Sequence, residues 1–179
     1  GWAFIVNNAL ETSAQEKQRK FMGVAVCKAC HTGKIAEKDV ATPSYEVWKD
    51  KPHAHAYESL ASDESKAIAK DMGIEDPQKA DECLKCHITA FGVDAQYLGK
   101  KYTVEEGVSC EACHGAGQGY ANIKVKKAIK SGDTEAASVG LIVKPGEETC
   151  LPCHNEESPT YRELNYEEAL KVIKHPIRE

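Results

Sequence analysis

The chain of 179 residues lacks long hydrophobic runs and carries no excess of positive charge. Its longest apolar stretch spans residues 2–6, whereas a membrane-spanning helix needs roughly 20 apolar residues in succession. The net charge of −5 argues against a nucleic-acid-binding surface. The hydrophobic share of 41% is modest but too high for a disordered chain, and the length suits one domain or two small ones. Membrane-spanning, nucleic-acid-binding and disordered proteins are therefore all disfavoured.

The cysteines, in contrast, are abundant and regularly placed. All eight fall in pairs with two residues between them, and a histidine follows each pair directly. Cys-x-x-Cys-His is the attachment signature of c-type haem, because two thiols at this spacing reach the two vinyl groups of one porphyrin and the next imidazole reaches the iron. We therefore expect four covalently bound haem c groups, attached at Cys27, Cys30, Cys83, Cys86, Cys110, Cys113, Cys150 and Cys153.

Two other uses of paired cysteines deserve comparison with haem attachment. Four Cys-x-x-Cys pairs could form two Cys₄ zinc sites in an interaction module, or a framework of disulfides. Both alternatives leave the four histidines that follow the pairs without a role, so haem is strongly favoured. A colourless purified protein would instead favour zinc.

The haem motifs also predict where the protein works. Haem is joined to c-type cytochromes outside the cytoplasm, so we expect an exported protein, periplasmic or extracellular. The sequence begins at Gly1 without a signal peptide and without a cysteine for a lipid anchor, which we interpret as a mature chain.

The residue pattern favours a mainly α fold with little or no β-sheet. Pro43 and Pro52 mark two helix starts, Thr103 with Glu106 predicts a capping box, and Asn165 with Glu168 predicts a helix over about residues 166–174. Glycines at positions 115, 117 and 119 are expected to let the backbone approach a porphyrin face. We expect an amino-terminal arm at residues 1–23 and a single haem-filled domain with long loops at residues 24–179.

The histidines are too few for four irons with two imidazoles each. Each motif supplies one ligand to its own iron, which assigns His31, His87, His114 and His154. Only three further histidines are present in the sequence: His53, His55 and His175. One iron must therefore be five-coordinate, or take Met22, Met72, a lysine or the amino terminus.

His53 and His55 are expected to serve different irons. If both residues are helical, their side chains diverge by about 200°, so they cannot bind the same iron. They could instead bind irons on opposite sides of one helix.

In combination, these motifs resemble the cytochrome c-554 family of tetrahaem carriers. The resemblance covers about residues 24–175 and leaves the first 22 residues outside. It rests on Val47-Trp48-Lys49-Asp50, His53-Ala54-His55-Ala56-Tyr57-Glu58-Ser59-Leu60, Phe91-Gly92, the run Gly107-Val108-Ser109 leading into the third motif, and His175 near the carboxyl end.

The resemblance implies a set of ligands. His53 corresponds to the family's ligand of the fourth haem and His175 to that of the third, while the second haem is five-coordinate in the family. The family's ligand of the first haem follows the third motif within a dozen or so residues, but residues 115–130 here contain no histidine. His55 is an addition to the family pattern and the expected replacement, either within the chain or toward the haem of a neighbouring subunit.

Electron transfer is the main function that we expect. Four haems in a chain of this size must lie close together, and tunnelling falls steeply with distance. The protein would be a periplasmic shuttle with redox-protein partners, or a homopolymeric conducting filament delivering electrons to an extracellular acceptor, as in some extracellular tetrahaem cytochromes of related layout.

The alternative is a haem enzyme. A five-coordinate second haem could bind nitric oxide, nitrite or hydroxylamine, and the resemblance allows weak nitric oxide reduction there. Catalysis would also require proton donors. No catalytic residue is predicted; the candidates for such a donor are His55, Tyr97, Tyr102 and Lys85.

Overall fold

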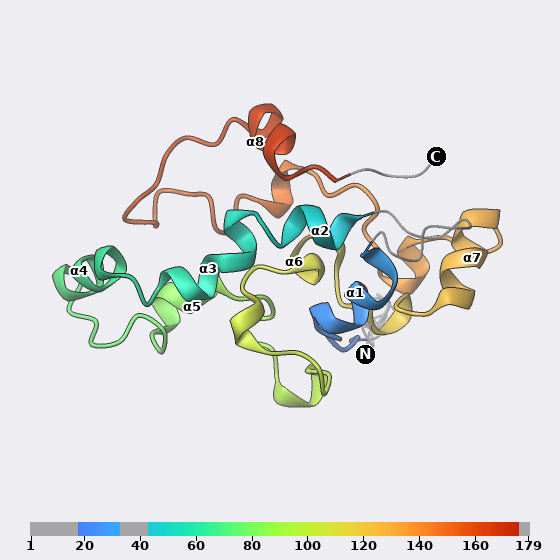
Figure 1. The fold of residues 1–179 in the computed structure, drawn as a ribbon, viewed down its shortest axis with the longest axis horizontal. Coiled ribbons are helices and arrows are strands. Elements are labelled where there is room, and N and C mark those ends of the chain that lie inside the picture. Colours follow the sequence, from blue (N-terminus) through green and yellow to red (C-terminus); the bar gives the residue numbers. More distant parts are fainter. Residues whose placement is uncertain (1–17, 33–42, 176–179) are drawn as a thin grey trace, which may run out of the picture.

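Short helices joined by long loops make up the structure, a computed structural model that describes residues 18–32 and 43–175 (Figure 1). The α-helices are α1 Val24–His31, α2 Ser44–Trp48, α3 Ala56–Ser59, α4 Asp63–Asp71, α5 Asp81–His87, α6 Cys110–His114, α7 Ile123–Ser131 and α8 Tyr166–Ile173. Six 3₁₀ turns lie between them in the described ranges: η1 Pro52–His55, η2 Ala95–Tyr97, η3 Val104–Glu106, η4 Gly117–Gly119, η5 Ala137–Val139 and η6 Glu147–Thr149. These residues form no β-strand beyond one isolated bridge between Phe21 and Leu98. The predicted mainly α fold is confirmed.

Local sequence signals explain several helix ends. Pro43 directly precedes α2 and Pro52 opens η1, as the sequence predicts. The side chain of Asn165 accepts a hydrogen bond from the Glu168 amide at 3.2 Å, so α8 begins where the cap places it. The predicted capping box at Thr103 is wrong, because the Thr103 side chain does not cap η3.

The side-chain core is small. Among the described residues the buried hydrophobic side chains are those of Val24, Leu60, Ala69 and Tyr120. No helix exceeds nine residues in the described part of the chain, and helices this short are marginal in isolation. The described chain therefore depends on contacts between its segments.

Hydrogen bonds between distant segments supply part of that support. The Thr89 side chain is 2% exposed and donates to the Gly107 carbonyl at 3.0 Å, while the Ser109 amide donates to its oxygen at 2.7 Å. The Val108 amide donates to the His53 carbonyl at 2.9 Å, and the Trp48 indole donates to the Val108 carbonyl at 3.0 Å. These bonds fix the segment before α6 against the segment that carries His53.

The helices that carry the first three motifs follow one another along the molecule. Figure 1 shows α4 at one end of the long axis and α7 at the other, with α5, α6 and α1 between them in that order. The second, third and first motifs therefore succeed one another along this axis.

Residues 1–17, most of the predicted arm, lie outside the described residues, so the arm and the boundary at residue 23 stay predictions. The described part of the arm, residues 18–23, contacts the rest of the chain. The Phe21 amide donates to the Tyr97 carbonyl at 2.9 Å, the Gly99 amide donates to the Phe21 carbonyl at 2.7 Å, and Arg19 donates to the Ser138 carbonyl at 2.8 Å.

Candidate haem centres

Each of the four motifs forms one helical turn. The first lies in α1, the second in α5 and the third in α6. The fourth follows η6, and its turn is closed because the amides of Cys153 and His154 donate to the Cys150 carbonyl at 3.1 and 2.9 Å. In such a turn the first and second cysteines share a face and the histidine follows on that side. The geometry suits two thioether bonds and one axial imidazole for each porphyrin.

All eight cysteines are half-buried, and none of them forms a disulfide. The disulfide framework considered from the sequence is therefore absent. Within residues 18–32 and 43–175, no group of three or more His, Cys, Asp or Glu side chains is placed to hold one metal ion. The two Cys₄ zinc sites would each need such a group.

The thiols of different motifs lie against one another. The Cys27 thiol of the first motif contacts the Cys110 thiol of the third, and this contact raises the pKa of Cys27. In the fourth motif, burial and the neighbouring thiol of Cys86 raise the pKa of Cys153 to about 12. Burial also raises the pKa of Cys113, and the charge of Cys150 adds to this effect. The first motif thus meets the third, and the second meets the fourth, while the third and fourth are close enough for their thiols to interact electrostatically.

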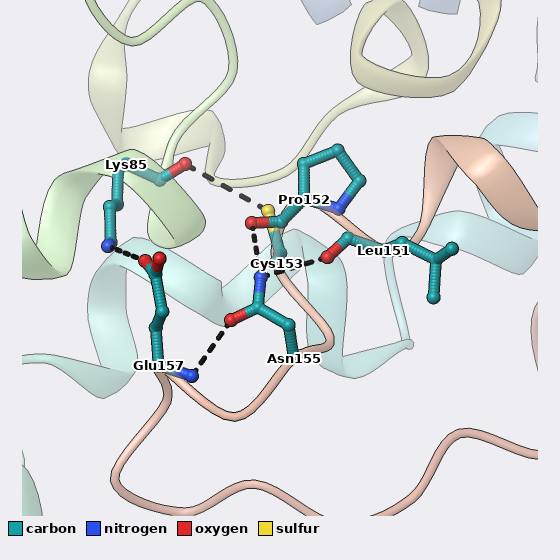
Figure 2. Close-up of polar contacts among 6 residues, drawn as sticks. All are labelled: Lys85, Leu151, Pro152, Cys153, Asn155 and Glu157. Carbon is teal, nitrogen blue, oxygen red and sulfur yellow. Dashed lines mark hydrogen bonds and ion pairs between the residues drawn. The ribbon is translucent and has the colours of Figure 1, made fainter.

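An ion pair joins α5 to the loop of the fourth motif (Figure 2). The Lys85 amine lies 2.5 Å from a Glu157 carboxylate oxygen, and the Cys153 thiol lies 3.9 Å from the Lys85 carbonyl. Asn155 shapes the loop, because its carboxamide oxygen accepts from the Glu157 amide at 2.9 Å and its nitrogen donates to the Leu151 carbonyl at 2.9 Å. These contacts hold the second and fourth motifs together.

Two of the three additional histidines lie opposite motif histidines. The ring centroids of His53 and His154 are 6.1 Å apart, and those of His114 and His175 are 5.7 Å apart. An iron bound by two imidazoles holds the centroids about 6 Å apart, since each metal–nitrogen bond is about 2 Å and each nitrogen lies about 1 Å from its ring centre. Both pairs therefore have room for one iron between their rings.

Backbone carbonyls orient two of the motif histidines. Nδ1 of His114 lies 2.7 Å from the Ile142 carbonyl, and Nδ1 of His87 lies 2.6 Å from the Ala56 carbonyl. A proton held on Nδ1 in this way leaves Nε2 as the free lone pair that can bind a metal. Burial lowers the pKa of both His114 and His53, which favours the neutral imidazole that coordination requires.

His55 has different surroundings. Its side chain is 57% exposed, its Nδ1 lies 3.0 Å from the Glu58 carboxylate, and its Nε2 lies 3.0 Å from the Lys49 carbonyl. The hydrogen bond to Glu58 raises the pKa of His55. Both ring nitrogens are thus engaged within its own segment, and its role as a ligand stays a prediction.

The two methionines have different surroundings. Met22 packs against Gly117, since a Cβ built on that glycine would lie 3.4 Å from the Met22 side chain. Met72 follows α4 at one end of the molecule and is 47% exposed.

Sequence reasoning missed Glu111, which lies inside the third motif. Its side chain is 2% exposed, and its two oxygens accept backbone hydrogen bonds from Met22 at 2.7 Å, Gly23 at 2.8 Å and Gly117 at 2.6 Å. Glu106 adds a fourth bond, from the Val24 amide at 2.9 Å. The two carboxylates satisfy amides at the amino end of α1, where negative charge is favoured, and so fix the first motif against the third.

Of the glycines after the third motif, Gly117 leaves room for the Glu111 carboxylate. A Cβ on Gly117 would lie 2.8 Å from a Glu111 carboxylate oxygen, and Gly115 has φ +80°. The space beside Gly117 is thus occupied by protein, whereas the sequence predicted that a porphyrin would use it.

The comparison with known families decides the class of protein. Residues 26–115 match the family described as cytochrome c554 and c-prime. The chain belongs to this family. As a member of the cytochrome c554 family with four Cys-x-x-Cys-His motifs, it is a multihaem c-type cytochrome with four haem c groups, as predicted.

Cytochrome c-554 of Nitrosomonas europaea is 29% identical over 157 residues, which cover 82% of this chain. The chain spans 59% of the length of that relative. The reduced-state structure of cytochrome c554 from the same organism is 25% identical and matches with a TM-score of 0.61, covering 88% of this chain and 84% of that one. In the part of the chain that the structure describes, no helix is long and apolar enough to cross a membrane.

Proposed function

We propose that this cytochrome carries electrons through its four haems. The observation that carries the proposal is the contact between thiols of different motifs, Cys27 with Cys110 and Cys86 with Cys153. Because each thiol is an attachment point at a porphyrin edge, contacting thiols bring porphyrin edges together. When bound, the haems supply one-electron redox couples, and electron transfer between such groups is fast only at short distance.

The chain's residues hold these groups in a fixed series. The proximity of attachment points in the order first, third, fourth and second supports a continuous path from α1 at one side to α5 at the other. Glu111 fixes the first motif to the third through backbone amides, and the Lys85–Glu157 pair fixes the second motif to the fourth. A rigid series of this kind lowers the structural rearrangement that each transfer requires.

The axial ligands that we propose follow from the two histidine pairs. His154 and His53 would hold the iron of the fourth haem, and His114 and His175 that of the third. The centroid separations of 6.1 and 5.7 Å support both assignments, and the hydrogen bond from His114 to Ile142 orients its ring for the purpose. His31 and His87 would supply one ligand each to the first and second haems.

Protein-film voltammetry of the purified holoprotein tests electron transfer against enzymatic turnover. We expect reversible waves that integrate to four electrons per chain, with no catalytic current when nitrite, hydroxylamine or nitric oxide is added. A sustained catalytic current with any of these compounds would contradict the proposal and favour a haem enzyme.

The contacts of the candidate proton donors also favour a carrier over an enzyme. Lys85 is paired with Glu157, the Tyr102 hydroxyl donates to the Thr89 carbonyl, and His55 contacts Glu58. Each polar group is thus engaged with a protein partner. Tyr97 lies in η2, where its carbonyl accepts from the Phe21 amide.

The carrier works outside the cytoplasm in this proposal, either as a periplasmic shuttle between redox proteins or as a subunit of an extracellular filament. His55 distinguishes these two forms, because in a filament its exposed ring would exchange its contacts with Glu58 and Lys49 for the haem of a neighbouring subunit. In a filament, His55→Ala abolishes the polymers seen by negative-stain electron microscopy. A shuttle gives no polymers in the wild type, and its redox spectrum is unchanged on dilution.

A further inference from the structure

We propose that Lys126 is the second axial ligand of the first haem, opposite His31. The inference rests on the proposed function only in so far as His31 binds the iron of the haem attached at Cys27 and Cys30. It assigns a ligand to the iron for which residues 115–130 hold no histidine.

The Lys126 amine lies at the metal-binding edge of His31. Its Nζ is 3.3 Å from Nε2 of His31, the same edge that the other motif histidines leave free when Nδ1 is bonded to a carbonyl. Two nitrogens on opposite sides of one iron are about 4 Å apart, since each metal–nitrogen bond is about 2 Å. A small extension of the flexible lysine stem therefore admits an iron between these two nitrogens.

Helix α7 directs this lysine, and not its neighbours, toward the first motif. Asn122 caps α7 by accepting from the Lys124 amide at 2.8 Å, which fixes the phase of the helix. Lys126 is half-buried, whereas Lys124, Lys127 and Lys130 are exposed. The sequence alone presents four similar lysines, and packing selects one of them.

The Lys126 amine lies over the aromatic ring of Tyr120. The Lys126 amine lies 5.4 Å from the centroid of the Tyr120 ring, which is itself 5% exposed. The Tyr120 hydroxyl donates to the Gly115 carbonyl at 2.5 Å, directly after the third motif. The lysine amine thus lies over a ring whose hydroxyl is bonded to the end of α6.

The contacts of Lys126 differ from those of the four lysines that form ion pairs among the described residues. Lys49, Lys79, Lys85 and Lys171 each pair with a carboxylate within 2.7 Å. None of the ion pairs between described residues involves Lys126. Its described contacts are instead an imidazole nitrogen and an aromatic face. When a metal binds, an amine gives up its proton and offers a lone pair, as a thiol does.

The other donors are placed elsewhere. His53 and His175 lie opposite His154 and His114, His55 is hydrogen-bonded to Glu58 and Lys49, and Met22 packs on Gly117. Lys126 therefore supplies the second axial ligand of the first haem. The second haem, at His87, is the one left with an open position.

The test compares spin states in the four-haem holoprotein. We expect the wild type to show a near-infrared magnetic circular dichroism band from one imidazole–amine haem, besides bands from bis-imidazole haems. Lys126→Ala and Lys126→Arg should both remove the imidazole–amine band and turn one further haem per chain high-spin. Lys126→His should restore a low-spin haem with the bis-imidazole signature. The control is Lys127→Ala, which changes an exposed lysine of the same helix and should leave every band in place.

Either of two results would overturn the assignment: a wild-type spectrum without an imidazole–amine band, or a band that persists in Lys126→Arg. The arginine variant keeps a long, flexible, polar side chain but cannot offer iron a lone pair, so a loss of the band in a folded variant reflects the loss of the ligand. Haem content and far-ultraviolet circular dichroism of each variant confirm that four haems are bound to a folded chain. The voltammetric test of electron transfer is independent of this readout, so a failure of one proposal is distinguishable from a failure of the other.

Discussion

The imidazole of His53 meets that of His154 nearly edge to face, with ring centroids 6.1 Å apart and an interplanar angle of 77°. One ring belongs to η1 and the other to the fourth motif, which are far apart in the sequence. Coordination of one iron by both rings, as we propose, would explain why these segments converge.

His53→Ala should convert one low-spin haem to high spin. The substitution removes the imidazole opposite His154 and leaves the fourth iron with an open position. Carbon monoxide binding to the dithionite-reduced protein should rise by one molecule per chain. His55→Ala is the matched control, since that ring is exposed and bonded to Glu58, and it should leave carbon monoxide binding unchanged in the isolated subunit. An unchanged spectrum for His53→Ala would refute the assignment.

His175→Ala should have the same effect on the third haem, because its ring lies 5.7 Å from that of His114. The two histidine pairs involve different irons, so the double variant His53→Ala/His175→Ala should gain two high-spin haems. Electron paramagnetic resonance of the oxidised protein measures this count. A double variant with one new high-spin signal would mean that the two histidines do not serve separate irons.

Glu111→Gln should destabilise the protein by roughly 2–3 kcal/mol. The buried carboxylate accepts three backbone hydrogen bonds with two oxygens, and an amide can offer only one oxygen to them. The measurement is guanidinium unfolding of the holoprotein, followed by circular dichroism. Glu135→Gln, at an exposed position, should change the unfolding free energy by less than about 0.5 kcal/mol. Equal stability of the two variants would contradict the proposal that the Glu111 carboxylate stabilises the fold through its backbone hydrogen bonds.

Glu106 should make the protein less stable as the pH rises. Burial raises the pKa of Glu106 above its usual value of 4.5. A carboxyl with a higher pKa in the folded state than in the unfolded state contributes stability below the unfolded pKa, and this contribution is lost as the pH rises through the folded pKa. Between about pH 4 and pH 7, unfolding of wild type and Glu106→Gln should therefore diverge, with the wild type losing more stability.

The exposed neighbour Glu105 provides the control for this pH dependence. The pKa of Glu105 is lowered, first by a hydrogen bond from its own backbone amide and then by one from Thr103. Its contribution to the stability of the fold therefore has the opposite sign, since it is present above the unfolded pKa and lost as the pH falls through the folded pKa. Glu105→Gln should therefore not reproduce the behaviour of Glu106→Gln. Parallel pH profiles for wild type and Glu106→Gln would contradict the assigned shift.

The sequence predicts local features of this protein well and long-range ones poorly. Each Cys-x-x-Cys-His motif is local, so the haem class, the mainly α fold and the cap at Asn165 could all be predicted. The capping box at Thr103 was wrong because Glu106 reaches across to the Val24 amide. The family resemblance separates His53 from His55, but their spacing alone does not, and packing places His53 opposite His154 and leaves His55 exposed.

Two side chains with central roles in this account carry no sequence signal of their own. Glu111 occupies a variable position of the motif, and its three amide partners come from other segments. Lys126 is one of four lysines in α7, and only the position of that helix beside His31 distinguishes it.

Reductive titration of the holoprotein under carbon monoxide tests the central claim most directly, because it counts electrons and open irons in one sample. The account predicts four electrons per chain, with carbon monoxide bound to one haem in four, the second. Fewer than four electrons, or carbon monoxide on two or more haems, would contradict the account of a four-haem carrier in which His53, His175 and Lys126 close the other three irons.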